Sequence, residues 1–138
     1  MKIFQLSVLS LLFLILISCK KDDEKISSLE DTWELKSQTN GTSGNVTEYP
    51  SNNGSLIIFS HNNYQTFSNH QLVKSGTFKV VEETSILNNS KGKRIIYDND
   101  PDQIRTFFNV KGNSLEVYVD AFDGPTSSYI RKTTVTQL

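Results

Sequence analysis

The sequence predicts an all-β domain, an antiparallel up-and-down β-barrel of about eight strands. Short runs rich in Val, Ile, Phe, Tyr and Thr recur along the chain, and clusters of Asn, Gly, Ser and Asp separate them. Apolar and polar side chains alternate within the runs, which gives each expected strand one apolar face. One apolar face and one solvent-exposed face per strand indicate an antiparallel sheet around a single core.

The first eighteen residues are expected to be a lipoprotein signal peptide. Lys2 precedes an apolar run at residues 3–17, which is shorter than the about 20 residues that a membrane-spanning helix needs. The run ends in Leu16-Ile17-Ser18-Cys19, which resembles the lipobox read by the lipoprotein signal peptidase. That resemblance implies cleavage before Cys19 and attachment of acyl chains such as palmitate. Cys19 is the one cysteine of the chain, so an internal disulfide is excluded.

Residues 19–28 are expected to be a flexible tether, because they show no apolar pattern. Lys20 follows the cysteine, where the aspartate associated with inner-membrane retention is absent. The run of lysines and acids at residues 20–25 resembles the signal that exports some Gram-negative lipoproteins to the cell surface. We therefore expect a lipid-anchored protein of the outer membrane, exposed on the cell surface, with the periplasmic face as the alternative.

The region from residue 29 to 138 is expected to form one domain. Its expected strands are residues 32–39, 55–60, 64–68, 72–82, 93–97, 105–110, 114–120 and 128–135. Gly112-Asn113 predicts a tight hairpin with positive φ angles, and the polar stretch 40–54 predicts the longest loop. Eight strands with hairpin-length links suit a closed barrel, and an immunoglobulin-like sandwich is the alternative.

Three short motifs resemble the lipocalin-like domains of bacterial lipoproteins, over roughly residues 29–138. They are Trp33 in the first strand, the run Ser75-Gly76-Thr77-Phe78, and Tyr129-Ile130-Arg131 in the last strand. In lipocalins an Arg of the last strand packs over a Trp of the first, and Trp33 and Arg131 match these positions. The glycine that precedes the lipocalin Trp is replaced here by Asp31. Related domains bind small apolar molecules or have no known ligand.

The resemblance implies a hydrophobic ligand inside the barrel, bound by Trp33, Ile58, Phe78, Phe108, Val117 and Arg131. Leu115 and Val119 are also expected to face the interior. These side chains are bulky, and an eight-stranded barrel can be filled by its own side chains. The alternative is therefore a filled barrel that acts as a non-enzymatic interaction or accessory subunit of a cell-surface complex. The expected partners are the membrane through Cys19, and either a small hydrophobic ligand or a surface protein.

Other functions find little support in the sequence. The formal net charge of −1 leaves no basic excess for nucleic acid. Catalytic motifs are lacking, so we do not expect an enzyme or a cofactor. His61 and His70 lie in turn-like contexts, and residues 98–102 resemble only the start of a calcium loop, so no metal site is expected.

Several aromatic side chains fall in or beside expected loops or in the polar register of a strand. Aromatic rings in such places can stack on sugars or cover a barrel mouth. They are Tyr49, Tyr64, Tyr97, Tyr118 and Phe122.

Overall fold

A computed structural model of the protein describes residues 29–132. The expected signal peptide, Cys19 and the tether lie outside the described residues, as do the last residues of the final expected strand. Within residues 29–132 no helix is long and apolar enough to cross a membrane. The strands of this part are β1 (Asp31–Thr39), β2 (Val46–Glu48), β3 (Leu56–Ser60), β4 (Asn63–Ser68), β5 (Gln71–Thr84), β6 (Lys91–Tyr97), β7 (Thr106–Lys111), β8 (Ser114–Val119) and β9 (Thr126–Arg131).

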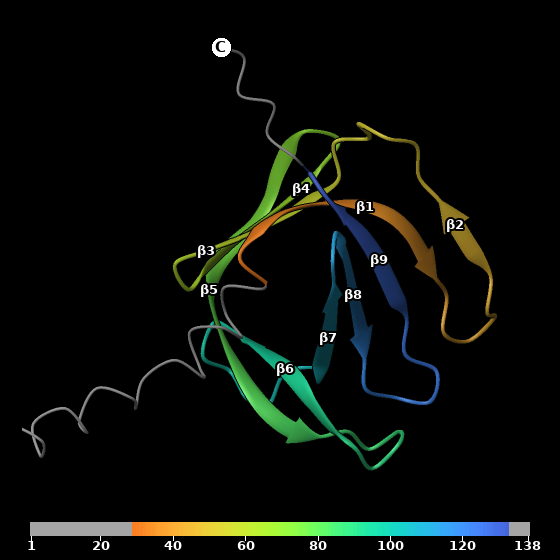
Figure 1. Ribbon diagram of the computed structural model, residues 1–138, viewed down its shortest axis with the longest axis vertical. Helices are drawn as coiled ribbons and strands as arrows, with labels where there is room; N and C mark the ends of the chain where they lie inside the picture. The colour runs from red at the N-terminus through yellow and green to blue at the C-terminus, as the bar shows by residue number, and fades with distance from the viewer. Residues whose placement is uncertain (1–28, 133–138) are drawn as a thin grey trace, which may run out of the picture.

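The strands form one antiparallel sheet that closes on itself (Figure 1). β1 pairs with β3, each later strand pairs with the next, and β9 returns to pair with β1. The closing ladder places Trp33 opposite Arg131 and Thr39 opposite Thr126. The expected eight-stranded, lipocalin-like up-and-down barrel is therefore confirmed, and the alternative of an immunoglobulin-like sandwich is wrong.

β2 is an additional strand that the sequence did not predict. It lies within the stretch 40–54, which we expected to be a loop, and pairs with the end of β1. Its three residues are all exposed, so they carry no alternation of apolar and polar side chains. Backbone hydrogen bonding to β1 alone defines this strand, which is why the pattern of side chains missed it.

Alternate residues of the strands point into the barrel and form its core. The buried core cluster comprises Leu29, Trp33, Ile57, Phe59, Tyr64, Phe78, Ile95, Phe108 and Leu115. Val80, Tyr97, Val110, Val117 and Tyr129 are half-buried and pack against it. In β8 the alternation that the sequence showed is confirmed, because Leu115 is buried and Glu116 is exposed.

Ile58 does not face the interior, and the expectation that it does is wrong. Ile57 and Phe59 are 6% and 1% exposed and belong to the core cluster, so Ile58 between them lies on the opposite face of β3. The run from Leu56 to Phe59 is apolar at every position. Without alternation the phase of a strand is not set by its own sequence, and a shift of one residue exchanges its two faces.

A second buried group lies on the opposite face of β6, β7 and β8. Phe107 is completely buried and stacks on Tyr118, with 5.9 Å between the ring centroids. A Cβ at Gly92 would lie 2.8 Å from the Phe107 ring, so the backbone of β6 packs directly on that ring. The guanidinium of Arg105 lies 5.7 Å from the same ring. The barrel wall is therefore thickened on this side by contacts outside the main core.

Two hairpin turns use residues with positive φ angles. His61 and Asn62 have φ of 49° and 64°, and Asn69 and His70 have φ of 48° and 67°, as in type I′ turns. In the turn at Gly112-Asn113 only Gly112 has a positive φ, 58°, so the expected hairpin forms with a different turn geometry. Both histidines are exposed turn residues.

Candidate functional site

One end of the barrel is closed by Trp33 and Arg131. The guanidinium carbon of Arg131 lies 4.5 Å from the centroid of the Trp33 ring. The indole Nε1 donates a hydrogen bond of 2.8 Å to the carbonyl of Leu29, which is completely buried. Arg131 also forms an ion pair with Asp31. Asp31 thus supplies a carboxylate to the arginine that covers the tryptophan.

The interior next to this end is filled by side chains. Trp33 is 0% exposed, Phe59 and Phe108 are each 1% exposed, and Phe78 is 3% exposed. The rings of Phe59 and Phe78 meet edge to face, with centroids 4.9 Å apart. Side chains with so little exposed surface are enclosed by other protein atoms over almost their whole length. This part of the barrel is therefore packed like an ordinary protein core.

The residues predicted to bind a ligand lie at different depths. Trp33, Phe78 and Phe108 belong to the packed core cluster, together with Leu115. Val117 is half-buried at the margin of the cluster, Val119 is half-buried in the same strand, and Arg131 covers Trp33. The structure brings these side chains together as a core, while Ile58 lies outside it.

A cluster of three tyrosines adjoins this core. Tyr64 and Tyr97 meet edge to face, with ring centroids 4.7 Å apart. The hydroxyl of Tyr64 donates a hydrogen bond of 3.0 Å to Asp98. Burial raises the pKa of the Tyr97 hydroxyl far above its usual range, and the neighbouring Tyr129 and Tyr64 raise it further. Tyr97 therefore stays protonated at neutral pH and adds no charge to the interior.

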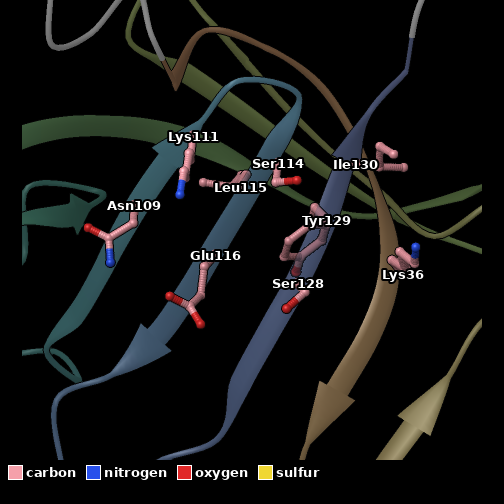
Figure 2. A pocket seen from close by; sticks show the side chains of 9 residues that line it. All are labelled: Lys36, Asn109, Lys111, Ser114, Leu115, Glu116, Ser128, Tyr129 and Ile130. Atoms are coloured by element: carbon pink, nitrogen blue, oxygen red, sulfur yellow. The ribbon is translucent and has the colours of Figure 1, made fainter.

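A hollow of about 550 Å³ lies on the outer face of β7, β8, β9 and β1 (Figure 2). Glu116 and Ser128 are register partners that line it, and along β8 Glu116 alternates with Leu115 and Val117, which pack in or against the core. Its charged groups are Lys36, Lys111 and Glu116. The full lining is Lys36, Asn109, Lys111, Ser114, Leu115, Glu116, Ser128, Tyr129 and Ile130. Its polar side chains suit a polar ligand better than a fatty one.

A smaller hollow of about 280 Å³ opens where the ladder between β6 and β7 ends. The last register pair there is Lys93 with Phe108, and beyond it the two strands separate. Its lining is Glu82, Lys91, Gly92, Lys93, Phe108, Asn109 and Val110. It too carries charged side chains, unlike the apolar calyx that a hydrophobic ligand requires.

Asp120 is the centre of a buried polar network that the sequence did not predict. Its carboxylate accepts hydrogen bonds of 2.5 Å from Ser85 Oγ, 3.0 Å from the Ile86 amide and 3.2 Å from Arg105 Nε. Burial alone would raise the pKa of Asp120, but these hydrogen bonds and the charge of Arg105 lower it below its usual value. An aspartate that is ionised and fully bonded in this way braces structure and does not exchange protons near neutral pH.

Glu83 extends this network from Arg105 to Arg94. Arg105 pairs with Glu83 at 2.7 Å, and Glu83 pairs with Arg94 at 2.8 Å. The Arg94 guanidinium also donates to the Pro101 carbonyl at 2.6 Å, which fastens the loop between β6 and β7. The members of this network are far apart in the sequence and follow no spacing, so no local pattern reveals them.

Metal-binding arrangements are not found among residues 29–132, where no group of three or more His, Cys, Asp or Glu side chains could hold an ion. In the segment compared with a calcium loop, Asp98 accepts hydrogen bonds from the Thr77 amide and from Tyr64. The carboxylate of Asp100 instead accepts a hydrogen bond from the backbone amide of Asp102. These carboxylates serve separate turns.

No protein-family model matches the chain, and no curated protein matches it.

Proposed function

We propose that this protein is a membrane-tethered interaction module. In this proposal Cys19 carries the lipid anchor, and the barrel is a solid scaffold that presents its loops to another protein on the cell surface. The single observation that carries the proposal is the packed interior. Trp33, Phe59 and Phe108, which cross the interior from three strands, have 0–1% of their surface exposed.

A carrier of hydrophobic molecules needs a barrel whose interior side chains leave room for the ligand. Here Trp33, Phe78 and Phe108, which were predicted to bind that ligand, belong to the core cluster instead. The hollows that carry charged side chains lie at the surface. A filled barrel is a stiff support for its loops. Loops on a rigid scaffold are where proteins commonly place binding residues.

The expected anchor fits this role. Residues 20–28 would span at most about 36 Å between the lipidated cysteine and Leu29 if fully extended. The domain would then remain close to the outer membrane, where a surface complex could recruit it. Lipidation can be tested by feeding producing cells labelled palmitate, with Cys19→Ala as the control. Label that persists in the variant would disprove the anchor.

The packed interior can be tested by native mass spectrometry of the mature chain carrying Cys19→Ser, purified without detergent. We expect the bare protein mass and no uptake of a fluorescent fatty acid. A small apolar molecule that co-purifies and is released on unfolding would show a hollow barrel. The interaction module would then be the wrong function.

A second candidate is a shallow site for a small apolar ligand. It is favoured by the half-buried Val80, Tyr97, Val117 and Tyr129, which border the core without being fully covered. The substitution Tyr97→Ala would enlarge this shallow site. If the site exists, the native protein should bind a fluorescent fatty acid in the micromolar range, and the variant should change that affinity at least fivefold.

A further inference from the structure

Three loops of the barrel each expose one large apolar side chain. Ile86 between β5 and β6 is 59% exposed, Ile104 between β6 and β7 is 71% exposed, and Phe122 between β8 and β9 is 91% exposed. We call these three side chains the apolar loop surface. Side chains exposed to this extent contribute little to the core, and three of them close together are unusual on a surface.

Asp120 ties the three loops together. Its carboxylate accepts the backbone amide of Ile86 at 3.0 Å, and its own amide donates to the Arg105 carbonyl at 2.9 Å. Ile104 immediately precedes Arg105, and Phe122 follows Asp120 by two residues. The three apolar residues are therefore each within two positions of this buried junction, and their backbones are held near one another.

The loop that carries Phe122 is also held from a second side. A Cβ at Gly41, in the loop after β1, would lie 1.9 Å from the carbonyl oxygen of Asp123, so the two backbones are in close contact. The amide of Gly124 donates to the Ala121 carbonyl at 2.9 Å, which closes the turn. A loop fixed in this way loses little conformational freedom on binding, and that lowers the cost of association.

The charges beside the apolar loop surface are negative. Asp100, Asp102 and Asp123 are exposed in two of the three loops. The one basic residue in the three loops, Arg105, is held by ion pairs of 2.7 Å to Glu83 and 3.1 Å to Asp120. The surface thus has an apolar centre and an acidic rim. Its complement is an apolar patch surrounded by Lys or Arg.

We infer that the apolar loop surface docks a partner protein that presents an apolar patch with a basic rim. This inference rests on the proposed function as an interaction module and names the surface that it uses. A second copy of the chain would bring acidic rim against acidic rim. A bilayer with anionic headgroups would repel the same aspartates, so a protein of opposite charge is the occupant that the charges favour.

The test uses the full lipidated chain in the cells that produce it, with the photo-crosslinker p-benzoylphenylalanine in place of Phe122. The matched control carries it in place of Val73, which is 63% exposed on β5. We expect one discrete protein adduct at position 122 and not at position 73. The crosslinked peptide of the partner should combine apolar residues with Lys or Arg.

Charge reversal supplies the decisive second measurement. The double variant Asp102→Lys, Asp123→Lys changes two exposed side chains and should leave the melting temperature within a few degrees. In protein that carries the crosslinker at position 122, the double variant should lower the adduct yield at least tenfold. An adduct of twice the chain mass, a lipid adduct, no adduct, or a yield that charge reversal leaves unchanged would each overturn the inference.

The same cells separate this inference from the proposed function. A crosslinker in place of Glu116 reports on the polar hollow of the outer face. Protein adducts at position 116 without any at 122 would leave an interaction module but reject the apolar loop surface. A co-purifying apolar ligand in the native mass spectrum would reject the module itself.

Discussion

Arg131 covers the ring of Trp33 at 4.5 Å, and the two residues are register partners across the ladder that closes the barrel. The contact therefore joins the first strand of the domain to the last. Asp31 completes it by pairing with the guanidinium, and the Arg131 backbone amide donates to the Asn113 carbonyl at 2.8 Å. One arginine thus links the tryptophan, the first strand and the hairpin between β7 and β8.

Replacement of Arg131 by Met should lower the free energy of unfolding by about 1–3 kcal/mol, since it removes a cation–π contact and a partly exposed ion pair. Asp31→Asn, which keeps the ring contact, should cost less than about 1 kcal/mol. Urea unfolding at pH 7 measures both, with Lys111→Met on the outer face as control. Equal stability of the Arg131 and Lys111 variants would show that the closing contact contributes little.

Loss of the Asp120 carboxylate should be more damaging, because the side chain is buried and braces three loops. Asp120→Asn should lower the free energy of unfolding by about 2–4 kcal/mol, since Ser85, Ile86 and Arg105 lose an ionised acceptor. Because its pKa is lowered in the folded protein, the stability it contributes is complete above the ordinary aspartate pKa. That stability is lost as the pH falls below about 4.

The measurement is urea unfolding from pH 7 to pH 2.5. The native protein should lose stability more steeply below pH 4 than Asp120→Asn does. Asp123→Asn, an exposed change in the same loop, should follow the native curve. Parallel curves for the native and Asp120→Asn proteins would contradict the lowered pKa.

The sequence predicted the barrel because apolar and polar side chains alternate within most of its strands, and because turn residues separate the strands. All eight barrel strands were expected, most of their ends within two residues, and the contact of Trp33 with Arg131 was expected from the lipocalin resemblance. Two failures have the same origin. Neither the exposed β2 nor the continuous apolar run around Ile58 carries an alternation that could define it.

The candidate functional surfaces could not be predicted in the same way. Phe122 was noted as a loop aromatic, but its relation to Ile86 and Ile104 depends on Asp120, whose side-chain partners come from two other loops. Contacts of this kind have no spacing in the sequence. Whether the interior is filled depends on the fit of all its side chains, which a list of bulky residues does not give.

The register of β3 can be tested by a pair of substitutions. Ile57→Ala should cost about 2–4 kcal/mol, because it leaves a cavity in the core, whereas Ile58→Ala should cost about 1 kcal/mol. Guanidinium unfolding measures both. Because the two residues are adjacent and chemically identical, the pair is its own control. The reverse order of the two costs would restore Ile58 to the interior.

Two glycines of the loop after β1 should respond differently to alanine. Gly41→Ala should cost about 2–3 kcal/mol, since the new methyl group would overlap the Asp123 carbonyl and overpack the contact. Gly44 has φ of 69° with no atom near its Cβ position, so Gly44→Ala should cost only about 1 kcal/mol of backbone strain. Thermal unfolding distinguishes the two. A harmless Gly41→Ala would mean that this loop does not support the loop of Phe122.

Alkaline pH should unfold the protein by ionising its buried tyrosines. Burial raises the pKa values of Tyr97 and Tyr129, so each favours the folded state fully below the ordinary tyrosine pKa of about 10 and loses that stability as the pH rises above it. Absorbance at 295 nm should show these hydroxyls titrating only together with loss of tertiary circular dichroism. The variant Tyr97→Phe cannot ionise at this position and should move the alkaline midpoint upward. Free titration of all tyrosines near pH 10 in a still-folded protein would show that water enters the barrel, and the solid interior on which the interaction module rests would have to be abandoned.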